Sequence, residues 1–204
     1  MLLRRSLAGA YWAVSRYRLE SEPAPDRPAV LIGAPHTSNW DFVIMLMITW
    51  RLGFSPKWLG KHTLFKRPYG RLMRALGGIP VDRRQPIGVV EEIVARVKAG
   101  EQFMLVVTPE GTRGRGTYWK SGFYRIARQT GMPLVLGYVD SSTRTAGLGP
   151  TLELTGDVRR DMDAVRAFYA DKRGIRPEDF TPPLLREEEA LPPSPGASAS
   201  PATP

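Results

Sequence analysis

The chain has 204 residues and no cysteine, which excludes disulfides, thiolate metal sites and a cysteine nucleophile. Hydrophobic residues make up 42%, enough for one substantial core, and the net charge of +9 favours an anionic partner. That partner is a phosphorylated small molecule, an acidic membrane surface or nucleic acid. The two histidines, His36 and His62, are too few for a histidine-rich metal site, so we expect no metal.

Residues 1–20 form a basic amphipathic segment. Apolar side chains recur at helical spacing among arginines, and no acid occurs before Glu20. This pattern is typical of a helix in a membrane interface and equally of a helix packed on the domain. A signal peptide fits less well, because Arg16 and Arg18 follow the apolar centre. The longest uncharged apolar run, residues 42–50, is too short to span a bilayer.

Strand and helix patterns alternate through the middle of the chain. The expected strands are 29–34, 57–61, 79–81, 103–107 and 134–139, and the expected helices are 40–50, 65–76, 86–98, 122–129 and a last one after Asp157. Because the strands are continuously apolar, we predict an α/β fold with a mixed, largely parallel sheet covered by helices on both faces. Residues 21–180 would form one folded domain, and residues 181–204, rich in Pro, Ser, Ala and Glu, a disordered tail.

The junction after the first of these strands holds the strongest candidate for chemistry. His36 and Asp41 are five residues apart, which on one continuous helix would separate them by about 140°. They can therefore meet only if His36 lies in the loop and Asp41 in the first helical turn. A carboxylate there would hold one imidazole nitrogen while the other activates a hydroxyl. The alternative is that Asp41 merely caps the helix, as in a Ser38-x-x-Asp41 capping box.

Two further strand ends carry charged side chains. Arg83 follows a strand and two glycines, where a guanidinium can grip a phosphate with paired hydrogen bonds. Residues 108–113 form a sharp Thr-Pro-Glu-Gly-Thr-Arg turn, in which Glu110 and Arg113 can simply pair with each other. Residues 57–84 carry eight cations and one acid, which predicts a positive side of the molecule or an ordinary solvated face.

Together these segments resemble the four ordered blocks of the glycerolipid acyltransferases, a family typified by lysophosphatidic acid acyltransferase. The matching blocks are residues 36–41, 78–83, 109–113 and 132–135, and the similarity spans about residues 29–140. Two departures stand out: Thr108 replaces the usual aromatic residue, and Trp40 is bulkier than the residue that often precedes the aspartate.

The resemblance implies an O-acyltransferase of phospholipid biosynthesis. Such an enzyme moves a fatty acyl group from acyl-CoA or acyl carrier protein to a hydroxyl of a lysoglycerophospholipid-type acceptor, with no bound cofactor. It implies that His36 is the general base and Asp41 its partner, and that the protein binds the cytoplasmic face of a membrane peripherally. The substrate-binding residues that it implies are Lys61, Arg83, Glu110, Gly111, Thr112 and Arg113.

Two other function classes remain open at this point. A hydrolase of acyl thioesters or phosphate esters would use His36 and Asp41 with water as the acceptor. A nucleic-acid-binding module would use the positive side, but the chain lacks a recognition-helix or RNA-binding aromatic motif, so we expect no nucleic-acid partner.

Overall fold

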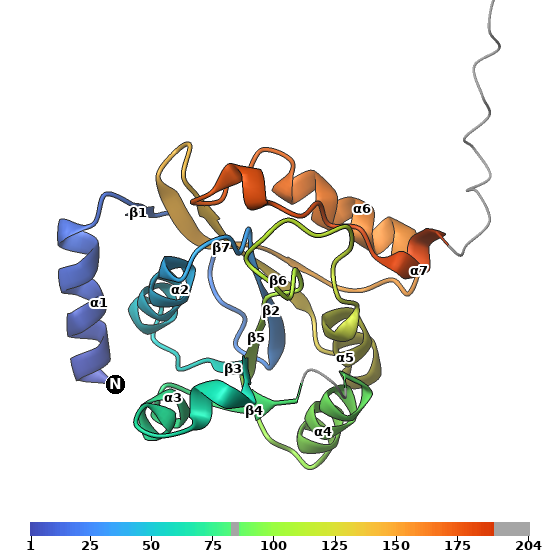
Figure 1. Cartoon of the computed structure of the whole chain (residues 1–204), viewed down its shortest axis with the longest axis horizontal. Coiled ribbons are helices and arrows are strands. Elements are labelled where there is room, and N and C mark those ends of the chain that lie inside the picture. The colour runs from blue at the N-terminus through green and yellow to red at the C-terminus, as the bar shows by residue number, and fades with distance from the viewer. Residues whose placement is uncertain (83–85, 190–204) are drawn as a thin grey trace, which may run out of the picture.

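The computed structural model describes residues 1–82 and 86–189, which form one seven-stranded sheet with helices on both faces (Figure 1). The strand order is β1-β7-β6-β2-β5-β3-β4, and β1 and β7 run opposite to the other five. The mixed, largely parallel α/β fold predicted from the sequence is therefore confirmed. The strands are β1 (Arg18–Leu19), β2 (Ala29–Ala34), β3 (Lys57–Lys61), β4 (Gly78–Val81), β5 (Met104–Val107), β6 (Leu134–Asp140) and β7 (Thr145–Leu152).

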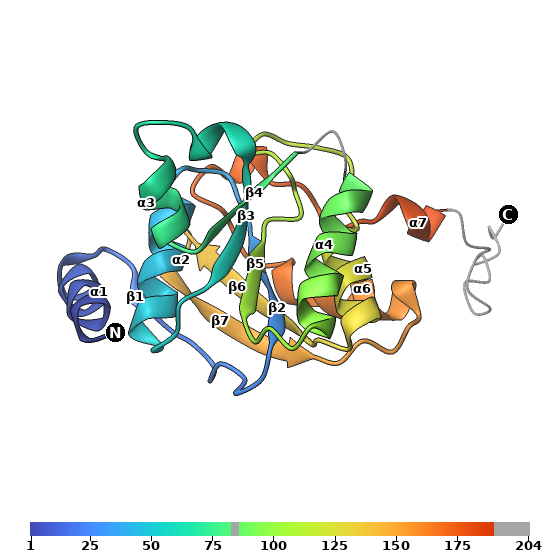
Figure 2. The same ribbon diagram turned by 90° about the horizontal axis from the view of Figure 1, so that it is seen from below.

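Helices cover the sheet in two layers (Figure 2). One face carries α4, α5 and α6, and the other carries α2 with α1 outside it. Alternate side chains of β2 serve the two cores: Val30 and Ile32 enter the α4–α6 side, and Leu31 enters the α2 side. The helices are α1 (Leu2–Val14), α2 (Trp40–Arg51), α3 (Gly70–Ala75), α4 (Pro86–Lys98), α5 (Gly122–Thr130), α6 (Val158–Tyr169) and α7 (Arg186–Glu189), with short 3-10 turns η1 (His62–Phe65) and η2 (Pro177–Asp179).

Two local expectations differ from the structure. The single helix predicted over residues 65–76 is instead η1 followed by α3, because Pro68 cannot continue a helix and the chain restarts at Gly70. Strands β1 and β7 were not predicted. The sequence of β7 contains Gly147, Gly149 and Pro150, residues that are rare in strands. Its two glycines are needed because a Cβ would collide with the Glu20 carbonyl or the Phe168 ring.

The disordered tail predicted from residue 181 is wrong for residues 181–189. Thr181 and Leu185 are fully buried, and Leu185 forms a bridge with Trp119. The Glu188 carboxylate accepts a hydrogen bond from Arg166 at 2.7 Å. The polar composition misleads because buried Thr181, buried Leu185 and the ion pair of Glu188 with Arg166 anchor the segment. Residues 190–204, the rest of the predicted tail, lie outside the described residues.

Helix α1 packs on the domain through one face and exposes another. Ala8 is buried against Leu46 and Trp50 of α2, and the Trp12 indole donates to the Met47 carbonyl at 3.2 Å. The side chains of Leu2, Leu3, Leu7 and Val14 are exposed. Within residues 1–82 and 86–189, no helix has the length and apolarity needed to cross a bilayer.

Candidate active site

The sheet topology brings three of the predicted motifs to one edge. Strands β2, β5 and β3 are parallel neighbours in the sheet. His36 follows β2, residues 108–113 follow β5, and Lys61 is the last residue of β3. Because the carboxyl ends of parallel strands lie at the same edge, segments far apart in the chain meet there.

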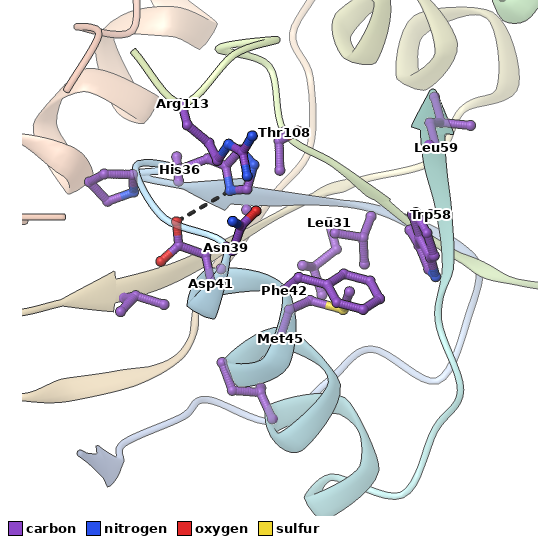
Figure 3. A pocket seen from close by; sticks show the side chains of 18 of the residues that line it. Leu31, His36, Asn39, Asp41, Phe42, Met45, Trp58, Leu59, Thr108 and Arg113 are labelled. Carbon is purple, nitrogen blue, oxygen red and sulfur yellow. Dashed lines mark ion pairs between the residues drawn. The ribbon is translucent and has the colours of Figure 1, made fainter. Parts of the chain in front are cut away.

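A cavity of about 540 Å³ lies between α2 and this end of the sheet (Figure 3). Its interior is apolar, and exposed polar residues line its outer part. The apolar lining includes Leu31, Phe42, Met45, Ile48, Trp58, Met73, Val106 and Leu148, and the exposed polar lining includes Asn39, Lys61, Thr63, Thr112 and Arg113. The cavity therefore offers an apolar chamber with a cationic, polar entrance.

His36 and Asp41 meet in this cavity. The imidazole Nδ1 lies 3.3 Å from Asp41 Oδ2, as the dashed line in Figure 3 shows. His36 is in the loop and Asp41 in the first turn of α2, the arrangement that their spacing required. The same Oδ2 atom accepts the backbone N–H groups of Thr37 and Ser38, each at 2.8 Å. The capping role and the contact with the imidazole are thus combined in one carboxylate oxygen.

Glu110 lies behind the His36 loop and not in the cavity wall. Its side chain is 3% exposed, and it is absent from the residues that line the cavity. Its Oε1 accepts the backbone N–H of His36 at 2.6 Å. Glu110 thus bonds to backbone amides, those of His36 and Thr181, whereas Arg113 lies in the cavity wall near His36 (Figure 3).

Burial raises the pKa of the Glu110 carboxyl to about 7, although the amides of His36 and Thr181 and the charge of His36 favour its ionised form. An acid whose pKa rises on folding holds its proton in the folded state after the unfolded chain has lost it. The free energy of unfolding should therefore decrease as the pH rises from the ordinary pKa of a glutamate to about 7.

We predict that the wild type loses about 2–3 kcal/mol more stability than Glu110→Gln between pH 5 and pH 8. Urea denaturation of both proteins at the two pH values measures this difference, and titration of the other groups cancels in the comparison. Equal pH dependence in the two proteins would show that Glu110 keeps an ordinary pKa.

The structure places most of the predicted site residues together. Lys61, Gly111, Thr112 and Arg113 line the cavity with His36 and Asp41, whereas Glu110 does not. Arg83 lies outside the described residues. Residues of β6 and β7 in the wall, such as Tyr138, Gly147 and Leu148, were missed because only the order of strands in the sheet brings them there.

The fold and the site define an α/β enzyme in which a histidine–carboxylate pair opens onto an apolar cavity with cations at its entrance. The acyltransferase family model matches residues 16–136, more than half of the sequence, so the chain belongs to the acyltransferase family. The resemblance drawn from the four sequence blocks is thereby confirmed, and the chain is an enzyme of acyl transfer.

A solved structure gives a matching fold. The 1-acyl-sn-glycerophosphate (LPA) acyltransferase PlsC from Thermotoga maritima is similar with a TM-score of 0.58 and 16% sequence identity. The match covers 80% of this chain and 75% of that one. At this identity, the likeness concerns the fold. A comparison with curated protein sequences gave no match.

Proposed function

We propose that the enzyme transfers a fatty acyl group from an acyl thioester, acyl-CoA or acyl carrier protein, to a hydroxyl of a lysoglycerophospholipid-type acceptor. The observation that carries this proposal is the His36–Asp41 pair, 3.3 Å apart, in the wall of an apolar cavity that Lys61 and Arg113 also line. An acyl chain suits the apolar interior, and an acceptor phosphate suits the two cations. The similar fold of an LPA acyltransferase is consistent with this acceptor class.

In the proposed mechanism, Asp41 holds Nδ1 of His36, so Nε2 is the nitrogen that receives the proton of the acceptor hydroxyl. The hydroxyl oxygen attacks the thioester carbonyl and forms a tetrahedral intermediate. The intermediate collapses, the carbon–sulfur bond breaks, and the imidazolium returns its proton to the leaving thiolate. Asp41 stabilises the charged imidazole during these steps. No acyl-enzyme is required.

The reaction is tested by incubating the purified protein with acyl-CoA or acyl carrier protein and a panel of lysolipid and amino-lipid acceptors. Thiol release and the mass of the lipid product are measured together. We expect stoichiometric formation of thiol and acylated lipid. Thiol release with free fatty acid as the sole product, whatever the acceptor, would instead identify a thioester hydrolase.

The proposed acceptor is a membrane lipid, and α1 is the element that we propose for membrane contact. Leu2, Leu3 and Leu7 are exposed on this helix, which also carries Arg4 and Arg5 in its first turn and no acid. The Arg4 guanidinium donates to the Ala75 carbonyl, so α1 adjoins α3. Helix α3, η1 and the residues between them expose Leu64, Tyr69 and Leu72 together with Lys66, Arg67 and Arg71. Apolar side chains beside cations favour an anionic membrane surface.

We predict that Leu3→Glu combined with Leu7→Glu weakens binding to vesicles of phosphatidylcholine and phosphatidylglycerol at least about tenfold, because two inserted leucines are lost. Vesicle flotation gives the bound fraction. Ala95→Glu with Ala99→Glu is the matched control: both residues are exposed and belong to or follow α4, across the sheet from α1 (Figure 2). If the two double variants float equally, α1 is not the membrane contact.

A further inference from the structure

Glu110 connects the His36 loop to the loop after β5. Its Oε1 accepts the His36 amide at 2.6 Å, the shortest of the hydrogen bonds described for the His36–Asp41 loop. Asp41 holds the next two amides, those of Thr37 and Ser38. Two buried carboxylates therefore fix three successive backbone N–H groups around His36. Because the backbone is held in this way, the position from which the His36 side chain extends into the cavity is also fixed.

The C-terminal segment, residues 173–189, holds both catalytic loops from outside. The Arg176 amide donates to Thr37 Oγ1 at 3.0 Å, next to His36. Thr181 Oγ1 accepts the Gly116 amide and the Thr181 carbonyl accepts the Trp119 indole, each at 2.8 Å. The Thr181 amide stabilises the ionised form of the Glu110 carboxyl. This segment lies beyond residues 16–136, so the family match does not cover it.

The position of Glu110 argues against a direct contact with the acceptor. The carboxyl is 3% exposed and lies outside the cavity wall, and the groups that influence its ionisation are His36, Asp41 and the Thr181 amide. Fully buried Tyr169 is close enough to feel its charge. We infer that Glu110 is a positioning residue: held by the C-terminal segment, its carboxyl fixes the His36 backbone and thereby the direction of the imidazole. This inference rests on the proposed role of His36 as the base.

Steady-state kinetics separate positioning from acceptor binding. Glu110→Ala is expected to lower kcat about 10- to 100-fold, since a displaced base reacts poorly, with an acceptor KM within about twofold of wild type. Glu110→Gln should recover most of kcat, because its amide oxygen can still accept the His36 N–H. A raised acceptor KM with unchanged kcat would overturn the inference and place Glu110 in the acceptor site.

NMR of the His36 amide provides a test that does not depend on activity. It uses Glu110→Gln, so it remains available if Glu110→Ala fails to fold. With only two histidines in the chain, ¹⁵N-histidine labelling gives two backbone amide signals, from His36 and His62. At pH 8, where the Glu110 carboxyl is ionised, the His36 amide proton of Glu110→Gln should lie upfield of its wild-type position, because a charged acceptor is replaced by a neutral one, while the His62 signal stays in place. A His36 amide that does not move would overturn the inference even if His36 is the base.

Thr181→Val tests the C-terminal segment without touching either carboxylate. It removes the acceptor of the Gly116 amide, and we expect kcat to fall about two- to tenfold and the His36 amide signal to shift. Thr151→Val, at an exposed position of β7, is the matched control. If Thr181→Val keeps the wild-type kcat and the wild-type His36 amide signal, the C-terminal segment does not help to position His36.

Discussion

Replacing His36 with glutamine should lower kcat for acyl transfer by about 10²- to 10⁴-fold, the range attributed to a general base. The imidazole lies in the cavity wall with one nitrogen against Asp41, and glutamine has a similar length but cannot take a proton at neutral pH. Thiol release from acyl-CoA under saturating acceptor measures the loss. Circular dichroism and thermal unfolding confirm that the variant is folded.

His62→Gln is the matched control, because His62 is the second histidine of the chain and does not line the cavity. It should keep near-normal kcat. Asp41→Asn should lose at least about tenfold, since the amide oxygen can still accept the Thr37 and Ser38 N–H groups but no longer stabilises a charged imidazole. Near-normal transfer by folded His36→Gln would refute the proposed mechanism while leaving the family assignment intact.

Replacing Arg113 with alanine should raise the KM for a phosphate-bearing acceptor about 10- to 100-fold, the equivalent of one or two hydrogen bonds to a charged group. Arg113 is exposed and lines the cavity near His36 (Figure 3), so the guanidinium is placed to hold an anionic group while the hydroxyl meets the base. The acceptor concentration series is measured at saturating acyl thioester.

The acceptor itself supplies the sharpest control for this prediction. With a monoacylglycerol, which lacks the phosphate, Arg113→Ala and the wild type should show similar KM values. Arg115→Ala, two residues along the same loop and outside the cavity wall, should resemble the wild type with both acceptors. If Arg113→Ala weakens both acceptors equally, the guanidinium acts on something other than the phosphate.

The parts of the fold that the sequence predicted are those governed by local rules. Strand β2 is uniformly apolar and bounded by prolines, and its observed limits match the prediction. Helix α5 ends at Gly131, which adopts a left-handed conformation with φ of 69°, as a glycine after a helix commonly does. The His36–Asp41 contact was also predictable, because spacing and helix geometry leave one way for the two side chains to meet.

Long-range packing determined what the sequence could not predict. Strand β7 contains poor strand formers and exists because β6 pairs with it and Phe168 covers Gly149. Residues 181–189 have the composition of a polar tail. They are ordered because Thr181 and Leu185 bind Trp119, which lies more than 60 positions earlier in the chain. The sequence motif placed Glu110 with the acceptor-binding residues, yet the side chain points to the His36 backbone.

The central place of β2 in the sheet has a consequence for how the protein is made. Ala29 pairs with Met104, and Val30 pairs with Leu134, so both neighbours of this apolar strand are synthesised long after it. A nascent chain keeps β2 unpaired until β5 and β6 emerge, and such non-local pairing slows folding and exposes the chain to aggregation. The loop that carries His36 follows β2 directly, so it takes its final shape in the same late step, and the His36–Asp41 pair forms only when the centre of the sheet is complete.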